Sequence, residues 1–165
     1  MFSIGEFLVY GSSGVCRVED ICERDCGNGK REYYVLQPVY DNRSTLYIPT
    51  DSEKLATHAK ALLTEQEIYE IIDNMPEESF DWIANDRERT DAFRNILEKG
   101  SRKDIARLMR TIYLRKTELA ARGKKLRSAD ETMMQRAEKL LFGEFAWVLG
   151  ISPAEVTGFI SERVS

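Results

Sequence analysis

The stretch Thr64-Glu65-Gln66-Glu67-Ile68 separates a part of the chain with strand signals from a part with helix signals. Thr64 and Glu67 have the spacing of a capping box, in which a hydroxyl and a carboxylate satisfy backbone N–H groups at the start of a helix. Apolar residues then recur at helical spacing up to Met75, and we expect Pro76 to end the element. The sequence therefore predicts that helices begin here.

Helical patterns continue from this point onward. Ser101 and Asp104 have the spacing of a helix start, and Gly100 is expected to close the preceding helix. The further helices are predicted over 92–99, from 101 to a linker at 122–125, from 128 to near 150, and from 152 onward. We therefore predict an α-helical bundle over residues 61–165.

Residues 2–50 carry strand signals instead. Short runs rich in β-branched and aromatic residues alternate with turns rich in glycine and asparagine. The predicted strands are 7–10, 15–21, 33–36 and 45–49, with turns at 11–14, 26–30 and 41–42, and His58 is placed in a linker. Several short strands in so few residues indicate a small curled sheet or SH3-like β-barrel over residues 1–60, so the predicted fold class is α+β, β then α.

Positive charge is concentrated between Arg94 and Arg127. This segment holds twelve Lys or Arg residues against Glu98, Asp104 and Glu118, a net charge of +9, whereas the whole chain carries −4. A basic segment on an acidic protein is typical of a local contact with phosphates. A solvated helix face is the alternative interpretation, because most charge runs are of that kind.

Three of these cations, Lys103, Arg107 and Arg110, recur at helical spacing. They fall on a different face from the apolar residues Ile105, Leu108, Met109 and Ile112. One helix can therefore present a core side and a cationic side.

The chain shows no signature of catalysis. His58 is the only histidine, and no nucleophile elbow or catalytic-cysteine motif accompanies it. Cys16, Cys22 and Cys26 lack paired C-x-x-C spacing, so we interpret them as reduced cysteines of a cytoplasmic protein and expect no metal or other cofactor. We expect neither a membrane span nor a secretory signal, because no long apolar run is present. A non-enzymatic protein is predicted.

Trp82 follows the first helix, in a short segment that also contains Phe80. A tryptophan usually anchors a core, and composition alone favours that interpretation. The polar, arginine-bearing stretch 84–89 favours another, in which the ring stacks on or wedges between bases. Trp147 lies within an apolar helix and is assigned to packing.

Short motifs follow one another along the chain in a definite order. In the first half they occupy 2–5, 9–10, 14, 18–21, 33–36 and 46–49. In the second half they occupy 82, 96–100, 105–110, 126 and 137–145. In residues and in order, they resemble the CarD family of bacterial RNA-polymerase-binding regulators. Because the resemblance covers nearly the whole chain, it is more specific than any single motif.

The resemblance implies a Tudor-like barrel, residues 1–60, that docks on the RNA polymerase β subunit. It also implies a helical domain, residues 61–165, that binds promoter DNA at the upstream edge of the transcription bubble. There Trp82 would wedge into the minor groove and stabilise the open complex. This changes our interpretation of Trp82 from core anchor to wedge, and a wedge is expected to be largely exposed in the free protein.

Three positions depart from the family pattern. Tyr47 stands where an arginine is familiar, and additional residues lie between Trp82 and Gly100. Arg127 follows Leu126 where a small hydroxyl residue is usual, so we expect Ser128 to cap the next helix instead.

The resemblance and the charge pattern together give two sets of site residues. The predicted polymerase contacts are Arg24, Thr45, Leu46, Tyr47 and Ile48. The predicted DNA contacts are Trp82, Arg87, Arg89, Arg94, Arg102, Lys103, Arg107, Arg110, Lys124 and Lys125. We expect a monomeric transcription regulator. The alternatives are a protein–protein adaptor, whose basic helix contacts an acidic partner, and a metal-dependent enzyme, which elemental analysis would test.

Overall fold

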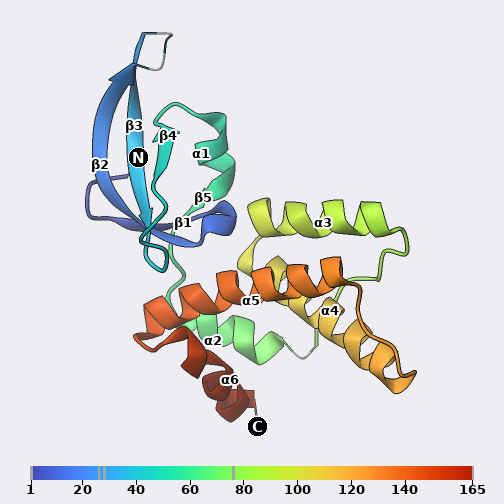
Figure 1. The fold of residues 1–165 in the computed structure, drawn as a ribbon. Coiled ribbons are helices and arrows are strands. Elements are labelled where there is room, and N and C mark those ends of the chain that lie inside the picture. The colour runs from blue at the N-terminus through green and yellow to red at the C-terminus, as the bar shows by residue number, and fades with distance from the viewer. Residues whose placement is uncertain (1, 26, 28, 76, 165) are drawn as a thin grey trace. The chain divides into compact units, whose positions relative to one another are not determined.

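A computed structural model describes residues 2–25, 27, 29–75 and 77–164 of the chain. The chain divides into two units, residues 1–62 and 63–165. The five strands seen in these residues belong to the first unit and the long helices to the second (Figure 1), so the predicted α+β class with strands first is confirmed.

The first unit, called here the sheet unit, contains one antiparallel sheet with the strand order β4-β3-β2-β1-β5. Its strands are β1 (Phe7–Tyr10), β2 (Val15–Asp25), β3 (Lys30–Pro38), β4 (Leu46–Pro49) and β5 (Ala59–Lys60). The 3-10 turn η1 (Gly11–Ser13) joins β1 to β2, and Gly14 closes it with a φ of 75° that favours glycine. The four predicted strands are confirmed, and β2 and β3 extend beyond their predicted ends.

The end of the sheet unit differs from the prediction. His58 is the last residue of helix α1 (Glu53–His58) rather than part of a linker, and β5 follows it directly. Ser52 caps α1 by accepting a hydrogen bond from the Lys54 backbone N–H. The sequence pattern missed β5 because its two residues are too few to show an alternation.

The core of the sheet unit comes from the inward faces of β1, β2 and β3. Its fully buried residues include Leu8, Cys16, Val18 and Leu36. Burial raises the pKa of the Cys16 thiol to about 12, so this cysteine stays protonated at neutral pH. Cys16 and Cys22 are free thiols, and the predictions for Cys26 and for the turn at 26–30 include residues outside those described.

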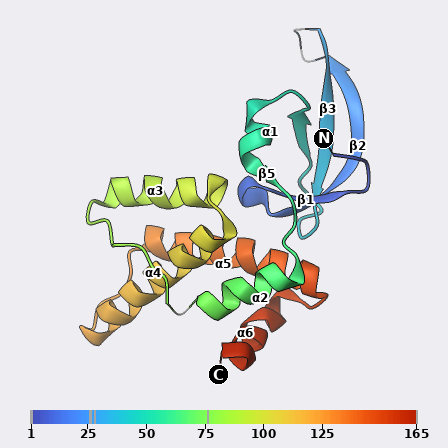
Figure 2. The ribbon, with the colours of Figure 1, turned by 180° about the vertical axis from the view of Figure 1, so that it is seen from behind.

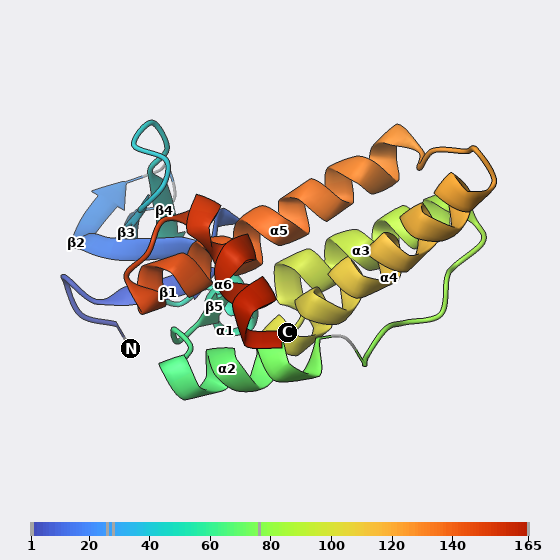
Figure 3. The same ribbon diagram turned by 90° about the horizontal axis from the view of Figure 1, so that it is seen from below.

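The second unit, called here the helical unit, follows with α2 (Glu65–Asn74), α3 (Asp86–Lys99), α4 (Arg102–Ala121), α5 (Ser128–Leu149), η2 (Pro153–Glu155) and α6 (Val156–Val164). The helices α3, α4 and α5 run alongside one another (Figure 3), and α2 lies next to α6 (Figure 2). Arg163 on α6 holds Asp73 on α2 through two hydrogen bonds of 2.9 and 3.1 Å.

The local signals at the helix starts explain where most helices begin. The capping box of Thr64 and Glu67 is present, and Ser101 accepts a hydrogen bond from the Asp104 N–H. The helix α3 begins earlier than its apolar pattern because Asn85 caps it. The expectation for Ser128 is wrong: Arg127 takes the N-cap position without a side-chain cap, and Ser128 is the first helical residue. Pro76, predicted to end α2, lies outside the described residues.

The core of the helical unit is a single apolar cluster. Its fully buried large side chains include Ile72, Leu108, Ile112, Leu141 and Phe145. Within the described part of the chain, no single helix is long and apolar enough to cross a membrane. The pair 128–149 and 153–164, bent by 101°, has the length and composition of a broken span, and the buried face of α5 accounts for that composition.

Candidate nucleic-acid and protein interfaces

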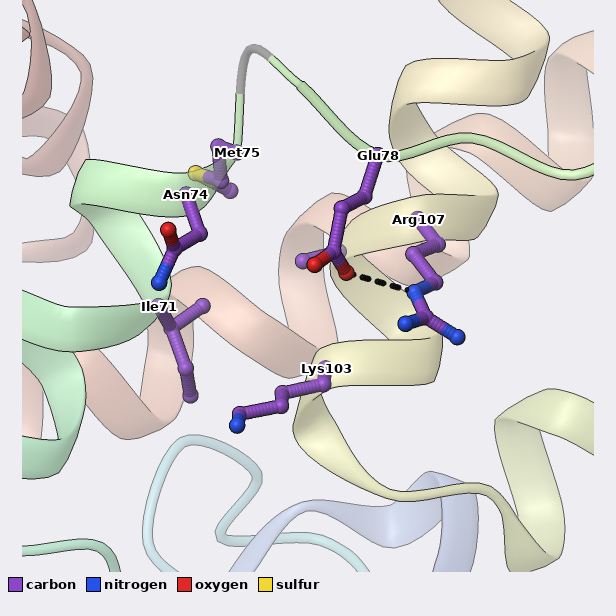
Figure 4. A pocket seen from close by; sticks show the side chains of 7 residues that line it. Ile71, Asn74, Met75, Glu78, Lys103 and Arg107 are labelled. Carbon is purple, nitrogen blue, oxygen red and sulfur yellow. Dashed lines mark hydrogen bonds and ion pairs between the residues drawn. The ribbon is translucent and has the colours of Figure 1, made fainter.

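The segment between α2 and α3 runs alongside α4 (Figure 3). Glu78 Oε2 accepts a hydrogen bond of 2.7 Å from Arg107 Nε, and the two side chains point toward one another beside a small pocket (Figure 4). Two residues later, the Phe80 N–H donates to Thr111 Oγ1 at 2.8 Å. Side chains of α4 therefore hold this segment before it reaches Trp82.

Trp82 is half-buried at the end of this segment. Its ring meets Phe93 edge-to-face, with 6.0 Å between the ring centroids. Two guanidinium groups also lie close to the ring, with Arg89 at 4.5 Å and Arg115 at 5.4 Å from its centroid. The expectation of a largely exposed ring is therefore wrong, because Phe93 and the two arginines cover part of it. The ring is not fully buried either.

Arg89 is a structural residue, which corrects its assignment as a DNA contact. It is 2% exposed, and all five of its N–H groups have acceptors within the helical unit. Nε and one terminal nitrogen bind the Asp130 carboxylate at 2.9 and 2.8 Å, and the same nitrogen binds Asp86 at 2.9 Å. The other nitrogen reaches the carbonyls of Ile83 and Ala84 at 2.9 and 3.4 Å. The hydrogen bonds to Asp130, followed by the one to Asp86, raise the pKa of Arg89.

Arg102 is a second correction of the same kind. Its Nε and one terminal nitrogen bind the two oxygens of Glu144 at 2.8 and 3.0 Å, and its side chain is 12% exposed. The same carboxylate accepts a hydrogen bond of 2.8 Å from the Leu63 backbone N–H. Arg102 therefore joins α4 to α5 and is not presented to a phosphate.

The remaining predicted cations lie at least partly at the surface of the helical unit. Arg87, Arg94, Lys103, Lys124 and Lys125 are exposed, and Arg107 and Arg110 are half-buried. The face of α4 that carries the three predicted cations is separate from its buried face, as predicted. Glu78 already occupies part of the Arg107 guanidinium through a hydrogen bond and ion pair. The same contact raises the pKa of Arg107.

Lys124 and Lys125 stand at an open groove between the end of α4 and the start of α5. Lys116, Ser128 and Thr132 also line this groove, which has a volume of about 540 Å³. Neither the Lys124 nor the Lys125 ammonium group has a hydrogen bond or ion pair with another described residue. Both ammonium groups are therefore available to an anion.

The predicted polymerase contacts fall into two groups, because alternate side chains along β4 point to opposite faces of the sheet. Tyr47 is 45% exposed, and Arg24 from β2 lies over its ring at 4.3 Å from the centroid. Thr45 is exposed next to the strand. Leu46 and Ile48 point the other way, and their partly buried side chains pack against the core of the sheet unit.

Sequence reasoning missed Arg115, although it lies in the basic segment. Its position four residues after Thr111 places it on the face of α4 that meets the segment of Trp82. The four-residue spacing indicated that Arg115 shares a helix face with Thr111. It did not indicate which segment of the chain would pack against that face.

Comparison with known proteins covers both units. Residues 2–58 match the model of the CarD-like/TRCF RID domain, and residues 67–161 match that of the CarD C-terminal domain. A protein of Bacillus subtilis (strain 168) named "Putative transcription factor YdeB" is 24% identical over 159 residues, covering 96% of this chain and 99% of the relative. The chain belongs to the CarD family of transcription regulators that associate with RNA polymerase.

Proposed function

We propose that this protein binds the RNA polymerase β subunit through residues 1–60 and promoter DNA through residues 61–165, and thereby stabilises the open complex. The function requires no enzymatic step and places a monomer in the cytoplasm, at the nucleoid through polymerase. The observation that carries the proposal is Trp82, an aromatic ring held half-buried by arginines in a unit with unoccupied surface cations.

The polymerase side of the proposal rests on β4. This strand is one of the two outer strands of the sheet in the described chain, so one edge of its backbone can pair with a strand of a partner. Leu46 and Ile48 would then contribute through their backbone groups, while Thr45 and Tyr47 present side chains on the outward face. Arg24 beside Tyr47 adds a cation with all of its donors available among the described residues.

The DNA side rests on a division between phosphate and base contacts. Lys103, Arg110, Lys124 and Lys125 supply positive charge that fixes the helical unit on the backbone of the duplex. Trp82 supplies an apolar surface that can occupy an unstacked base step at the edge of the bubble. An occupied step opposes reclosure of the duplex, which is how a wedge would lengthen the lifetime of the open complex.

The test compares the two tryptophans of the chain. We expect Trp82→Ala to lower the free energy of unfolding by about 1–2 kcal/mol, because the ring is half-buried and meets Phe93 edge-to-face. The same variant should markedly shorten the lifetime of the promoter open complex while polymerase binding persists. Trp147→Ala, which removes a tryptophan that is 39% exposed, is the matched control and should leave that lifetime unchanged.

Two outcomes would contradict the proposal. Equal open-complex lifetimes in Trp82→Ala and Trp147→Ala would remove the role of Trp82 as a wedge. Negligible DNA binding of the full chain at low salt would favour the protein–protein adaptor, because phosphate contacts are strongest under that condition.

A further inference from the structure

The segment before α3 contacts α4 at regular intervals along both. Residues 78, 80 and 82 contact residues 107, 111 and 115 in turn, through the interactions described above. Two residues of extended chain advance about 6.6 Å, and four residues of α-helix advance about 6.0 Å. Alternate residues of the segment therefore meet every fourth residue of α4 in register, and Trp82 is the last of them.

A second group holds the chain just after Trp82. Arg89 donates to the carbonyls of Ile83 and Ala84, and the Asp130 carboxylate on α5 holds its guanidinium. The same guanidinium lies over the Trp82 ring. The ring is thus contacted by Arg115 from α4 and by Arg89 from α3, whose guanidinium Asp130 on α5 holds.

We propose that Arg115 and Arg89 are positioning residues that hold the Trp82 ring in the orientation in which it meets DNA; this rests on the proposed function. A guanidinium over an aromatic face is attracted by the ring quadrupole, so each arginine favours one orientation of the ring over the others. Arg89 has every donor occupied, and the Arg115 side chain is 30% exposed and also pairs with Glu118 at 3.3 Å. Neither arginine is therefore primarily a phosphate contact.

The test uses Arg115 and a matched arginine at the C-cap of the same helix. Arg122 also pairs with Glu118, at 2.9 Å, but no contact with Trp82 is seen for it among the described residues. Arg115→Met and Arg122→Met each remove one positive charge from α4 or its C-cap, and only the first removes a contact to the ring. Both are made in a Trp147→Phe background, so that Trp82 is the only tryptophan whose fluorescence is measured.

We expect acrylamide to quench the fluorescence of Trp82 more strongly in Arg115→Met than in Arg122→Met. The melting temperatures of both variants are measured in parallel. On a forked promoter DNA, Arg115→Met should bind about two- to fivefold more weakly than Arg122→Met, which corresponds to a cation–π contact at a partly exposed site. The salt dependence of binding should be equal in the two variants. Arg115→Lys should restore much of the quenching protection, because a lysine ammonium also binds an aromatic face.

Equal quenching and equal affinity in Arg115→Met and Arg122→Met would overturn the positioning role. That failure is distinguishable from a failure of the proposed function. The quenching experiment requires no DNA, whereas the wedge fails only if Trp82→Ala leaves the open-complex lifetime unchanged.

Discussion

Each unit of the molecule contains an arginine that lies over an aromatic ring. The two pairs have similar distances but differ in the burial of the arginine and in the acceptors available to its N–H groups. In the sheet unit Arg24 lies 4.3 Å from the Tyr47 ring centroid, and in the helical unit Arg89 lies 4.5 Å from that of Trp82. Arg24 is exposed and has no hydrogen-bond acceptor among the described residues. Arg89 is buried and has an acceptor for every N–H.

The comparison shows that the ring contact alone does not define the role of an arginine. The number of N–H groups that remain without an acceptor decides whether a partner can use the side chain. By this measure Arg24 can bind a partner, and Arg89 holds the fold around Trp82. The same accounting separates Arg102, which is occupied by Glu144, from Lys124 and Lys125, which are not occupied.

The largest expected effect is on stability. Arg89→Ala should lower the free energy of unfolding of the helical unit by about 3–5 kcal/mol, because it leaves the buried Asp130 carboxylate without its partner. Arg24→Ala should change the free energy of unfolding by no more than about 0.5 kcal/mol. Urea denaturation followed by helical circular dichroism measures the first, and thermal melting measures the second. Similar losses in the two variants would remove the distinction between the two pairs.

The next effect concerns binding to polymerase. Arg24→Ala and Tyr47→Ala should each weaken binding to a β-subunit fragment by about tenfold or more, as expected for an exposed arginine and aromatic pair at the centre of an interface. Arg43→Ala is the control, because its side chain is 97% exposed and pairs only loosely, at 3.9 Å, with Asp41. Titration calorimetry on the full chain measures all three. Equal affinity across them would place the polymerase contact elsewhere.

A smaller effect should appear in the salt dependence of DNA binding. Lys124→Ala with Lys125→Ala should reduce the slope of log affinity against log salt by about 1.8, because each phosphate contact contributes about 0.9. The melting temperature should stay the same, since both side chains are exposed. Arg94→Ala, which loses an exposed cation already near Asp91 at 3.8 Å, should change the slope less. A slope that the double variant leaves intact would show that this groove does not meet phosphates.

The smallest effect is expected on stability in acid, at two helix starts where glutamate carboxylates accept hydrogen bonds from backbone N–H groups. Hydrogen bonds from the backbone N–H of Thr64 and Ser152 lower the pKa of Glu67 and Glu155. Their contribution to stability is therefore present above the unfolded pKa of about 4.3 and is lost as the pH falls through the lower folded value. Glu67→Gln with Glu155→Gln keeps the capping geometry, so its melting temperature should fall less steeply in acid than that of the natural protein. Parallel curves would contradict this.

Much of the fold could be predicted from local signals. The capping box at Thr64, the serine at position 101 and the strand alternation each act within a few residues, so their outcome depends little on the rest of the chain. The strand β5 could not be predicted, because it exists only by pairing with β1 across the sheet unit.

The candidate sites could be predicted only in part. The separate cationic face of α4 follows from helical spacing, but the pairing of Arg89 with Asp130 joins residues 41 positions apart and leaves no local signal. Leu46 and Ile48 show a related limit: a family position identifies a strand, while the pleat decides which of its side chains face the core. Arg115 was missed because its contact with Trp82 depends on a segment without regular structure.

The Glu144 carboxylate has a mechanical consequence. It binds the Leu63 N–H, at the first residue of the helical unit, and also binds Arg102 on α4. A pulling force that arrives along the chain from the sheet unit therefore meets a clamp to α4 and α5 before it reaches α2. The load is shared by the two longest described helices, and α2 is protected from being peeled away from its N-terminal end.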